Sequence, residues 1–230
     1  MNSTIDRQGA PSPPGTVAVI FAWDTGHYAT LFRNLNDLRL PDGSKQTFWR
    51  GRHRHLLLNQ AVEDALETQS YWVWFISEEH GFQPDVLESL ISKNQAIVAP
   101  IVVGNRGPFH PTAWTNVTDG KVEPLLLNQV TGPTTLTEVR GASTDGMLVR
   151  RAVFEAMGSS WFKMAGENEP EGIHFCERAA ELGFQTYIDT STRLSTLSDA
   201  EIIPVHRGDR WELTVKVRED MSFTQQLKHR

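Results

Sequence analysis

The sequence predicts a single α/β domain, with a mixed, mostly parallel central sheet flanked by helices and a small C-terminal β-hairpin. Apolar segments of strand length alternate with amphipathic helical segments along the chain, and no internal repeat interrupts the alternation. From Ile202 to Val217 apolar and polar residues alternate around Gly208-Asp209, which indicates the hairpin. Residues 1–15 are polar and proline-rich, so we expect a disordered tail there and a single domain over 16–230.

Composition narrows the classes of partner. The 230 residues carry a formal net charge of −6, which argues against broad electrostatic binding to nucleic acid or to an anionic membrane. Cys176 is the only cysteine, so an intrachain disulfide framework is excluded and a reducing compartment is expected. No apolar run approaches the ~20 residues of a membrane helix. We therefore expect a cytoplasmic protein without a membrane partner.

The first predicted strand covers residues 16–22 and ends in a polar turn, Trp23 to His27. An early strand that ends in a polar turn is a common nucleotide site in doubly wound sheets. Asp24 is therefore a candidate for donor binding, although a plain turn in which Asp24 caps the next helix is equally consistent with the pattern. A helix is expected over 28–38 and a turn over 41–44.

The stretch Tyr71 to Phe82 dominates the central part of the chain. Six apolar residues run without a charge, and Glu78, Glu79 and His80 then arrive together. Such a run predicts a strand buried on both faces, and polar residues at its carboxyl end are where open α/β sheets bind ligands. Acidic residues there would hold a metal ion or face a polar substrate.

A dense basic run, Trp49 to His55, precedes an amphipathic helix. Apolar residues recur there at helical spacing, at Leu58, Ala61, Val62, Ala65 and Leu66. Helix N-termini favour anions, so a phosphate-facing role for Arg52 and Arg54 is attractive. A solvated run of charges explains the same residues equally well.

The remaining elements alternate in the same way. After the central strand, we expect a helix opened by Pro84-Asp85, a buried strand at 96–103 and a loop over 104–123. Small residues at 139–146 predict a turn before a short apolar segment. Helices are expected at 150–157 and 173–182, and a strand at 184–189.

Four stretches together resemble a known family. They are Phe75 to Leu87, Gly141 to Phe154, Glu171 to Phe184, and Asp189 to Leu194. The third stretch contains the motifs Phe175-Cys176 and Leu182-Gly183-Phe184. In order and spacing they resemble nucleotide-sugar glycosyltransferases of the GT-A fold, the small bacterial and bacteriophage-type members. The resemblance covers roughly residues 16–217. It implies a GT-A-like domain that moves a sugar from a nucleotide-sugar, a UDP-sugar first of all, to an acceptor hydroxyl.

The resemblance also implies a chemistry. The nucleoside diphosphate that leaves develops negative charge, and in the family Mn²⁺ or Mg²⁺ stabilises it, held by a DxD motif and a late histidine. A carboxylate of an Glu-Asp pair acts as base on the acceptor in inverting members.

This sequence departs from that pattern at three chemical positions. The DxD positions read Ser77 and Glu79, the late histidine reads Thr196, and the Glu-Asp pair reads Glu171-Gly172. Glu78 and His80 offer substitute ligands, since carboxylate and imidazole form a workable pair. Three changes together suggest altered chemistry, leaving-group stabilisation without a metal, or no catalysis.

We therefore make the following assignments as expectations. The metal, if bound, is assigned to Glu79 and His80. The base is assigned to Glu171, Glu169 or Asp145. The donor-binding residues are assigned as Asp24, Arg52, Arg54, Asn59, Ser77 and Glu78. The alternative to a transferase is a catalytically degenerate relative that binds a nucleotide, a sugar or a protein. A modified DNA base stays open among the acceptors, and the sequence does not specify the oligomeric state.

Overall fold

A computed structural model describes residues 12–22, 28–104, 110–118, 121–130, 136–163, 171–197, 201–208, 210–216 and 222–226. The expected sites Asp24 and Glu169 lie outside these residues, as does most of the expected tail. Pro13 to Gly15 are described and hydrogen-bonded: the Trp72 indole donates to the Pro13 carbonyl at 2.8 Å, and the Tyr71 amide to that of Pro14 at 3.0 Å. Ordered packing therefore begins before the expected boundary at Thr16.

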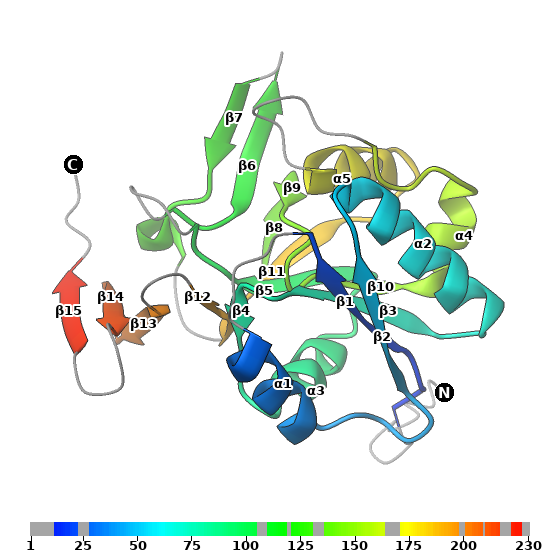
Figure 1. The fold of residues 1–230 in the computed structure, drawn as a ribbon. Helices are drawn as coiled ribbons and strands as arrows, with labels where there is room; N and C mark the ends of the chain where they lie inside the picture. The colour runs from blue at the N-terminus through cyan, green and yellow to red at the C-terminus, as the bar shows by residue number, and fades with distance from the viewer. Residues whose placement is uncertain are drawn as a thin grey trace, which may run out of the picture.

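A mixed seven-stranded sheet forms the centre of the molecule (Figure 1). Its order is β2-β1-β3-β10-β5-β11-β8. The pairings make β10 and β8 antiparallel to the other strands, so most of the sheet runs in one direction, as the sequence predicts. The bounds are β1 Thr16–Phe21, β2 Lys45–Arg50, β3 Trp72–Ser77, β5 Ile97–Ile101, β8 Leu136–Val139, β10 Leu148–Arg150 and β11 Thr186–Arg193.

Helices cover both faces of this sheet. On one face lie α2 (Arg54–Glu67), α4 (Arg151–Met157) and α5 (Glu171–Glu181), and on the other lie α1 (Tyr28–Asp37) and α3 (Val86–Ser92) (Figure 1). Alternate side chains of the buried strands supply the two cores: Phe75 packs with α2, α4 and α5, while Trp74 and Ile76 pack with α1 and α3. The apolar run of β3 is thus explained by burial on both faces. None of the described helices is long and apolar enough to cross a membrane.

Two smaller sheets flank the central one. A five-stranded sheet, order β15-β14-β13-β12-β4, contains the expected hairpin as β13 and β14, with Gly208 in its turn at φ +66°. Asp209 lies outside the described residues. A three-stranded sheet has the order β7-β6-β9. The bounds are β4 His80–Gly81, β6 Ala113–Thr118, β7 Lys121–Pro124, β9 Gly141–Ala142, β12 Ser195–Leu197, β13 Glu201–Arg207, β14 Arg210–Lys216 and β15 Ser222–Gln226. A short 3-10 helix covers Leu127–Gln129.

The prediction of a loop over 104–123 is wrong for the second half of that segment. β6 and β7 form a hairpin there that projects from the body of the molecule (Figure 1). The segment is rich in Thr, Asn and Gly, so local propensity indicated a loop. Pairing of Ala113 with Ala142 in β9 supplies the tertiary context that favours strands.

Candidate functional site

The site lies at the carboxyl ends of β1 and β3. β2 adjoins one side of β1 and β3 adjoins the other, so the chain reverses its direction of progress across the sheet between these strands. Open α/β sheets bind ligands in the crevice at such a switch point. Three further segments reach this end: the start of α2, which follows β2; the turn before the antiparallel strand β10; and β12, which pairs with β4.

The turn that follows β3 carries the residues expected to bind donor and metal. Ser77 and His80 are buried, and the Ser77 hydroxyl lies 2.8 Å from His80 Nδ1 in a hydrogen bond. Glu78 is fully buried, whereas Glu79 is partly exposed. Among the four residues of this turn, Glu79 is therefore the one whose side chain reaches the surface of the site.

Strand β12 closes over this turn. Thr196 is the backbone partner of His80, and the Leu197 amide donates to the Glu79 carbonyl at 2.6 Å. The position of the expected late histidine is thus held beside the position of the expected DxD motif. Thr196 does not offer a ligand there, because its hydroxyl is buried and donates to the Val103 carbonyl at 2.6 Å.

Arg54, the first residue of α2, is held by the turn that precedes β10. Its Nη2 donates to Thr144 Oγ1 at 2.9 Å and to Asp145 Oδ1 at 2.5 Å. The Ser143 hydroxyl donates to Asp145 Oδ2 at 3.0 Å and accepts the Asp145 amide at 3.2 Å. The Arg54 side chain is 8% exposed and that of Asp145 is 23% exposed, so the ion pair is shielded but reachable from solvent.

Burial and charge shift the acidities of this group of residues. Burial raises the pKa of Glu79, and the Asp145 carboxylate adds to the rise while Arg54 opposes it. Burial lowers the pKa of His80 and keeps its imidazole neutral near pH 7. Burial alone would raise the pKa of Asp145, but Arg54, His80 and the Ser143 hydroxyl together hold it below its usual range. Asp145 is therefore a carboxylate whose charge is already paired.

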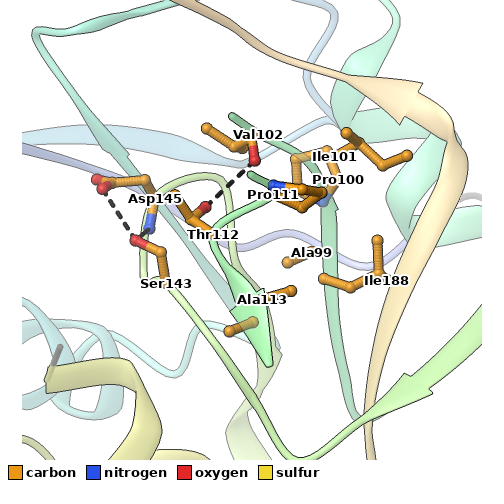
Figure 2. Close-up of a pocket in the computed structure, with 11 residues that line it drawn as sticks. Ala99, Pro100, Ile101, Val102, Pro111, Thr112, Ala113, Ser143, Asp145 and Ile188 are labelled. Atoms are coloured by element: carbon orange, nitrogen blue, oxygen red, sulfur yellow. Dashed lines mark hydrogen bonds between the residues drawn. The ribbon is translucent and has the colours of Figure 1, made fainter. Parts of the chain in front are cut away.

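A hollow opens beside Asp145 (Figure 2). It has about 210 Å³ of empty space, counting its open mouth, between β5, β11 and the segments around Thr112 and Ser143. Figure 2 shows Asp145 and Ser143 at one side, with Ala99 and Ile188 among the apolar lining. The hollow combines apolar walls with a few polar groups, but its enclosed space holds about one water molecule, far less than a small-molecule pocket.

Packing closes the position at which the resemblance places the catalytic base. A Cβ atom on Gly172 would overlap the Ala142 carbonyl oxygen and lie 3.1 Å from the Thr144 amide nitrogen. Helix α5 therefore begins against β9 so closely that only glycine fits. An Asp at 172 is excluded by the backbone of this protein as well as by its sequence.

The remaining predicted site residues have other surroundings. Asn59 forms two hydrogen bonds with the backbone of Phe162, at 2.8 and 3.0 Å, which anchor the segment after α4 rather than point to the switch point. Arg52 is exposed on the lead-in to α2. Glu171 is the first residue of α5. No described contact joins Arg52 or Asn59 to the Arg54–Asp145 pair.

Two residues of the site, Ser143 and Thr144, were not among the sequence assignments. The expected turn at 139–146 placed them near Asp145, but nothing in their spacing indicated that Thr144 binds an arginine 90 residues earlier or that Ser143 holds the Asp145 carboxylate. Pairing of residues so far apart in sequence depends on the fold, and a single sequence gives no signal for it.

Comparisons with known proteins agree on the fold. No protein-family model matches the sequence, and no curated protein matches it. Among solved structures, the chain is similar to A197 from STIV, with a TM-score of 0.55, 13% identity and coverage of 94% of this chain and 95% of that one. It is also similar to GalNAc-T7 in complex with UDP, GalNAc and Mn²⁺, with a TM-score of 0.54 and 11% identity.

The fold is glycosyltransferase-like. The match to GalNAc-T7 covers 84% of this chain but only 44% of that one, so the chain spans less than half of that structure. At these identities the likeness shows the architecture alone.

Proposed function

We propose that this protein is a glycosyltransferase that moves a sugar from a nucleotide-sugar donor to an acceptor hydroxyl. The observation that carries the proposal is the meeting of Arg54, Glu79 and Asp145 at the switch point of a glycosyltransferase-like fold. Ligands of open α/β sheets bind in that crevice. GalNAc-T7 was solved with UDP, which makes a UDP-sugar the first donor to test.

Each group has a proposed task. Arg54 provides positive charge for the diphosphate, whose charge grows as the sugar–phosphate bond breaks. Glu79 and Asp145 are close enough for the Asp145 charge to raise the pKa of Glu79, and we propose these two carboxylates as candidates to accept the proton of the acceptor hydroxyl. Of the two, Glu79 has the raised pKa that suits a proton acceptor near neutral pH.

A catalytically degenerate binder is the second candidate, and specific observations favour it. The base position is closed at Gly172, and the Thr196 hydroxyl is committed to a backbone carbonyl. Such a protein would bind the nucleotide without transferring sugar. We propose no class of acceptor, and the comparisons give no support to a modified DNA base.

A titration against UDP, GDP, TDP and CDP and their sugars tests the donor site. A ligand that binds only the folded state stabilises it by about 2.7 kcal/mol at a hundredfold excess over Kd, so the unfolding midpoint rises. Arg54→Gln should abolish the shift, whereas Arg39→Gln, at an exposed arginine paired with Glu88, should preserve it. If no nucleotide or nucleotide-sugar shifts the midpoint, the transferase proposal fails.

Release of nucleoside diphosphate from a bound nucleotide-sugar separates the two candidates. A transferase releases it through transfer or slow hydrolysis, and release falls in Glu79→Gln. A degenerate binder retains the intact donor at the same occupancy.

A further inference from the structure

The described residues do not form the metal site that the resemblance implies. Nowhere in the described ranges do three or more His, Cys, Asp or Glu side chains gather so as to hold a metal ion. Glu78 is fully buried, His80 Nδ1 is engaged by Ser77, and Thr196 stands where the family has a histidine. Among the described residues this leaves Glu79 and Asp145, and the Asp145 carboxylate is already paired with Arg54, whereas a divalent ion takes six or more oxygen ligands.

The Arg54 guanidinium is a fixed cation close enough to the turn after β3 for its charge to lower the pKa values of Glu79 and His80. Arg54 is anchored through Nη2 by Thr144 and Asp145, which leaves Nη1 and Nε without a hydrogen-bond acceptor among the described residues. Guanidinium groups bind phosphate oxygens through two parallel N–H donors. Arg54 is also the first residue of a 14-residue helix whose first turn contains no acid, so the helix dipole adds to its positive charge.

Asp145 weakens the electrostatic attraction between Arg54 and an anionic ligand. Its carboxylate offsets the Arg54 charge, and Glu79 lies close enough to raise the local negative charge further. A diphosphate must therefore compete with Asp145 for the guanidinium. A diphosphate offers several oxygens to the guanidinium and can accept two parallel N–H bonds, whereas Asp145 is bound through Nη2 alone.

We infer that the donor's diphosphate binds without a divalent metal ion, by taking over the Arg54 guanidinium from Asp145. The inference rests on the proposed function, and it adds the means by which the leaving group is held. Displacement leaves Asp145 as an unpaired carboxylate beside the sugar. Asp145 and the ligand thus compete for the same guanidinium group.

Calorimetric titration of UDP, GDP, TDP and CDP in EDTA, and again in Mn²⁺, tests this inference. Affinity for the nucleotide that binds should be the same in both. Asp145→Asn should raise that affinity about tenfold, because the amide keeps the hydrogen bond to Arg54 but removes the competing charge. Asp64→Asn is the matched control: Asp64 pairs with Lys45 at 2.5 Å at the start of β2, and its loss should leave the affinity unchanged.

The double variant Arg54→Gln/Asp145→Asn keeps the buried pair uncharged, so its loss of nucleotide binding would not reflect an orphaned buried charge. Binding that requires Mn²⁺, or an Asp145→Asn affinity equal to or weaker than that of the parent, would overturn the inference and leave the transferase proposal standing. Absence of binding to parent and Asp145→Asn protein in both buffers would overturn both.

Discussion

Gly172 lies where helix α5 begins, and its lack of a side chain lets the helix touch the segment that carries Thr144 and Asp145. This contact holds the 143–145 turn against the start of α5. Arg54 depends on this turn for both of its described hydrogen bonds. The position of Arg54 therefore depends on glycine at position 172, because a larger residue there would separate α5 from the turn that binds the guanidinium.

Gly172→Asp, which restores the family's carboxylate, should destabilise the protein without adding catalytic activity. The new Cβ overlaps the Ala142 carbonyl oxygen, and overpacking of this kind costs roughly 1–3 kcal/mol before the cost of burying a charge. Chemical denaturation measures the loss. Glu181→Asp, exposed at the other end of the same helix, is the control and should be close to neutral. Native stability with increased sugar transfer in Gly172→Asp would contradict this account.

At the scale of elements, the turn before β10 is shaped by Gly146. Its φ is +77°, and an added Cβ would overlap Leu194 and lie 2.7 Å from Pro100 Cγ. The Gly146 amide donates to the Phe75 carbonyl at 2.8 Å, and its own carbonyl accepts the Trp74 indole at 2.8 Å. The turn is therefore pinned to β3 on one side and packed against the start of β12 on the other.

Gly146→Ala should cost roughly 2–4 kcal/mol, the sum of a left-handed backbone penalty and overpacking. Nucleotide binding should weaken with it, since the turn holds Arg54. Unfolding in urea gives the first quantity and calorimetry the second. Gly158→Ala has the same sign of φ, +80°, with open space around its Cβ, so it isolates the backbone penalty and should cost only about 1 kcal/mol. Equal losses in the two variants would show that packing at Gly146 is unimportant.

The elements that sequence predicts well are those with a strong local signal. Helix α4 and strand β3 both lie within one residue of their expected bounds, because periodicity and apolar content express their burial directly. β2 and β12 were not predicted: β2 is an edge strand with mixed burial, and β12 is three residues long. Their strand conformation comes from partners far along the chain.

The same distinction between local signal and distant partners explains which features of the site the sequence could predict. Glu79, His80 and Arg54 were predicted from polar clusters at strand and helix ends and Asp145 from the family resemblance, yet their proximity depends on the antiparallel direction of β10. Asn59, assigned to donor binding, has its amide bound to the backbone of Phe162. Local patterns indicate which residues are polar at an end; topology decides which ends meet.

At the scale of the whole molecule, Cys176 reports on the larger core. It is the only cysteine and is buried on α5 among core residues. Burial, the largest cause, raises the pKa of its thiol from 9.0 to about 11, and the neighbouring Thr186 and Ala142 offset only part of the rise. The native protein should therefore resist thiol reagents at pH 8 and react only as fast as it unfolds.

The raised pKa also makes stability depend on pH. The unfolded thiol ionises near pH 9 while the folded one stays protonated to about pH 11, so the free energy of unfolding falls as pH rises through this window. The full contribution is about 2–3 kcal/mol. Urea unfolding at pH 8, 9, 10 and 11 measures this contribution. Between pH 8 and pH 11 the free energy of unfolding of Cys176→Ala should fall by about 2–3 kcal/mol less than that of the parent protein. Parallel curves for the two proteins would contradict the assignment.

Strand β12 lies late in the chain, yet it seals the turn after β3 that is made more than a hundred residues earlier. Domains begin to form during synthesis, from the N-terminal end. A nascent chain that has released β1 to β5 contains Arg54 and Glu79 but not Asp145, Thr196 or Leu197. The crevice therefore acquires its ion pair only after residue 145 is synthesised and its seal only after residue 197, and a product that ends before Asp145 would present Arg54 without its counter-charge.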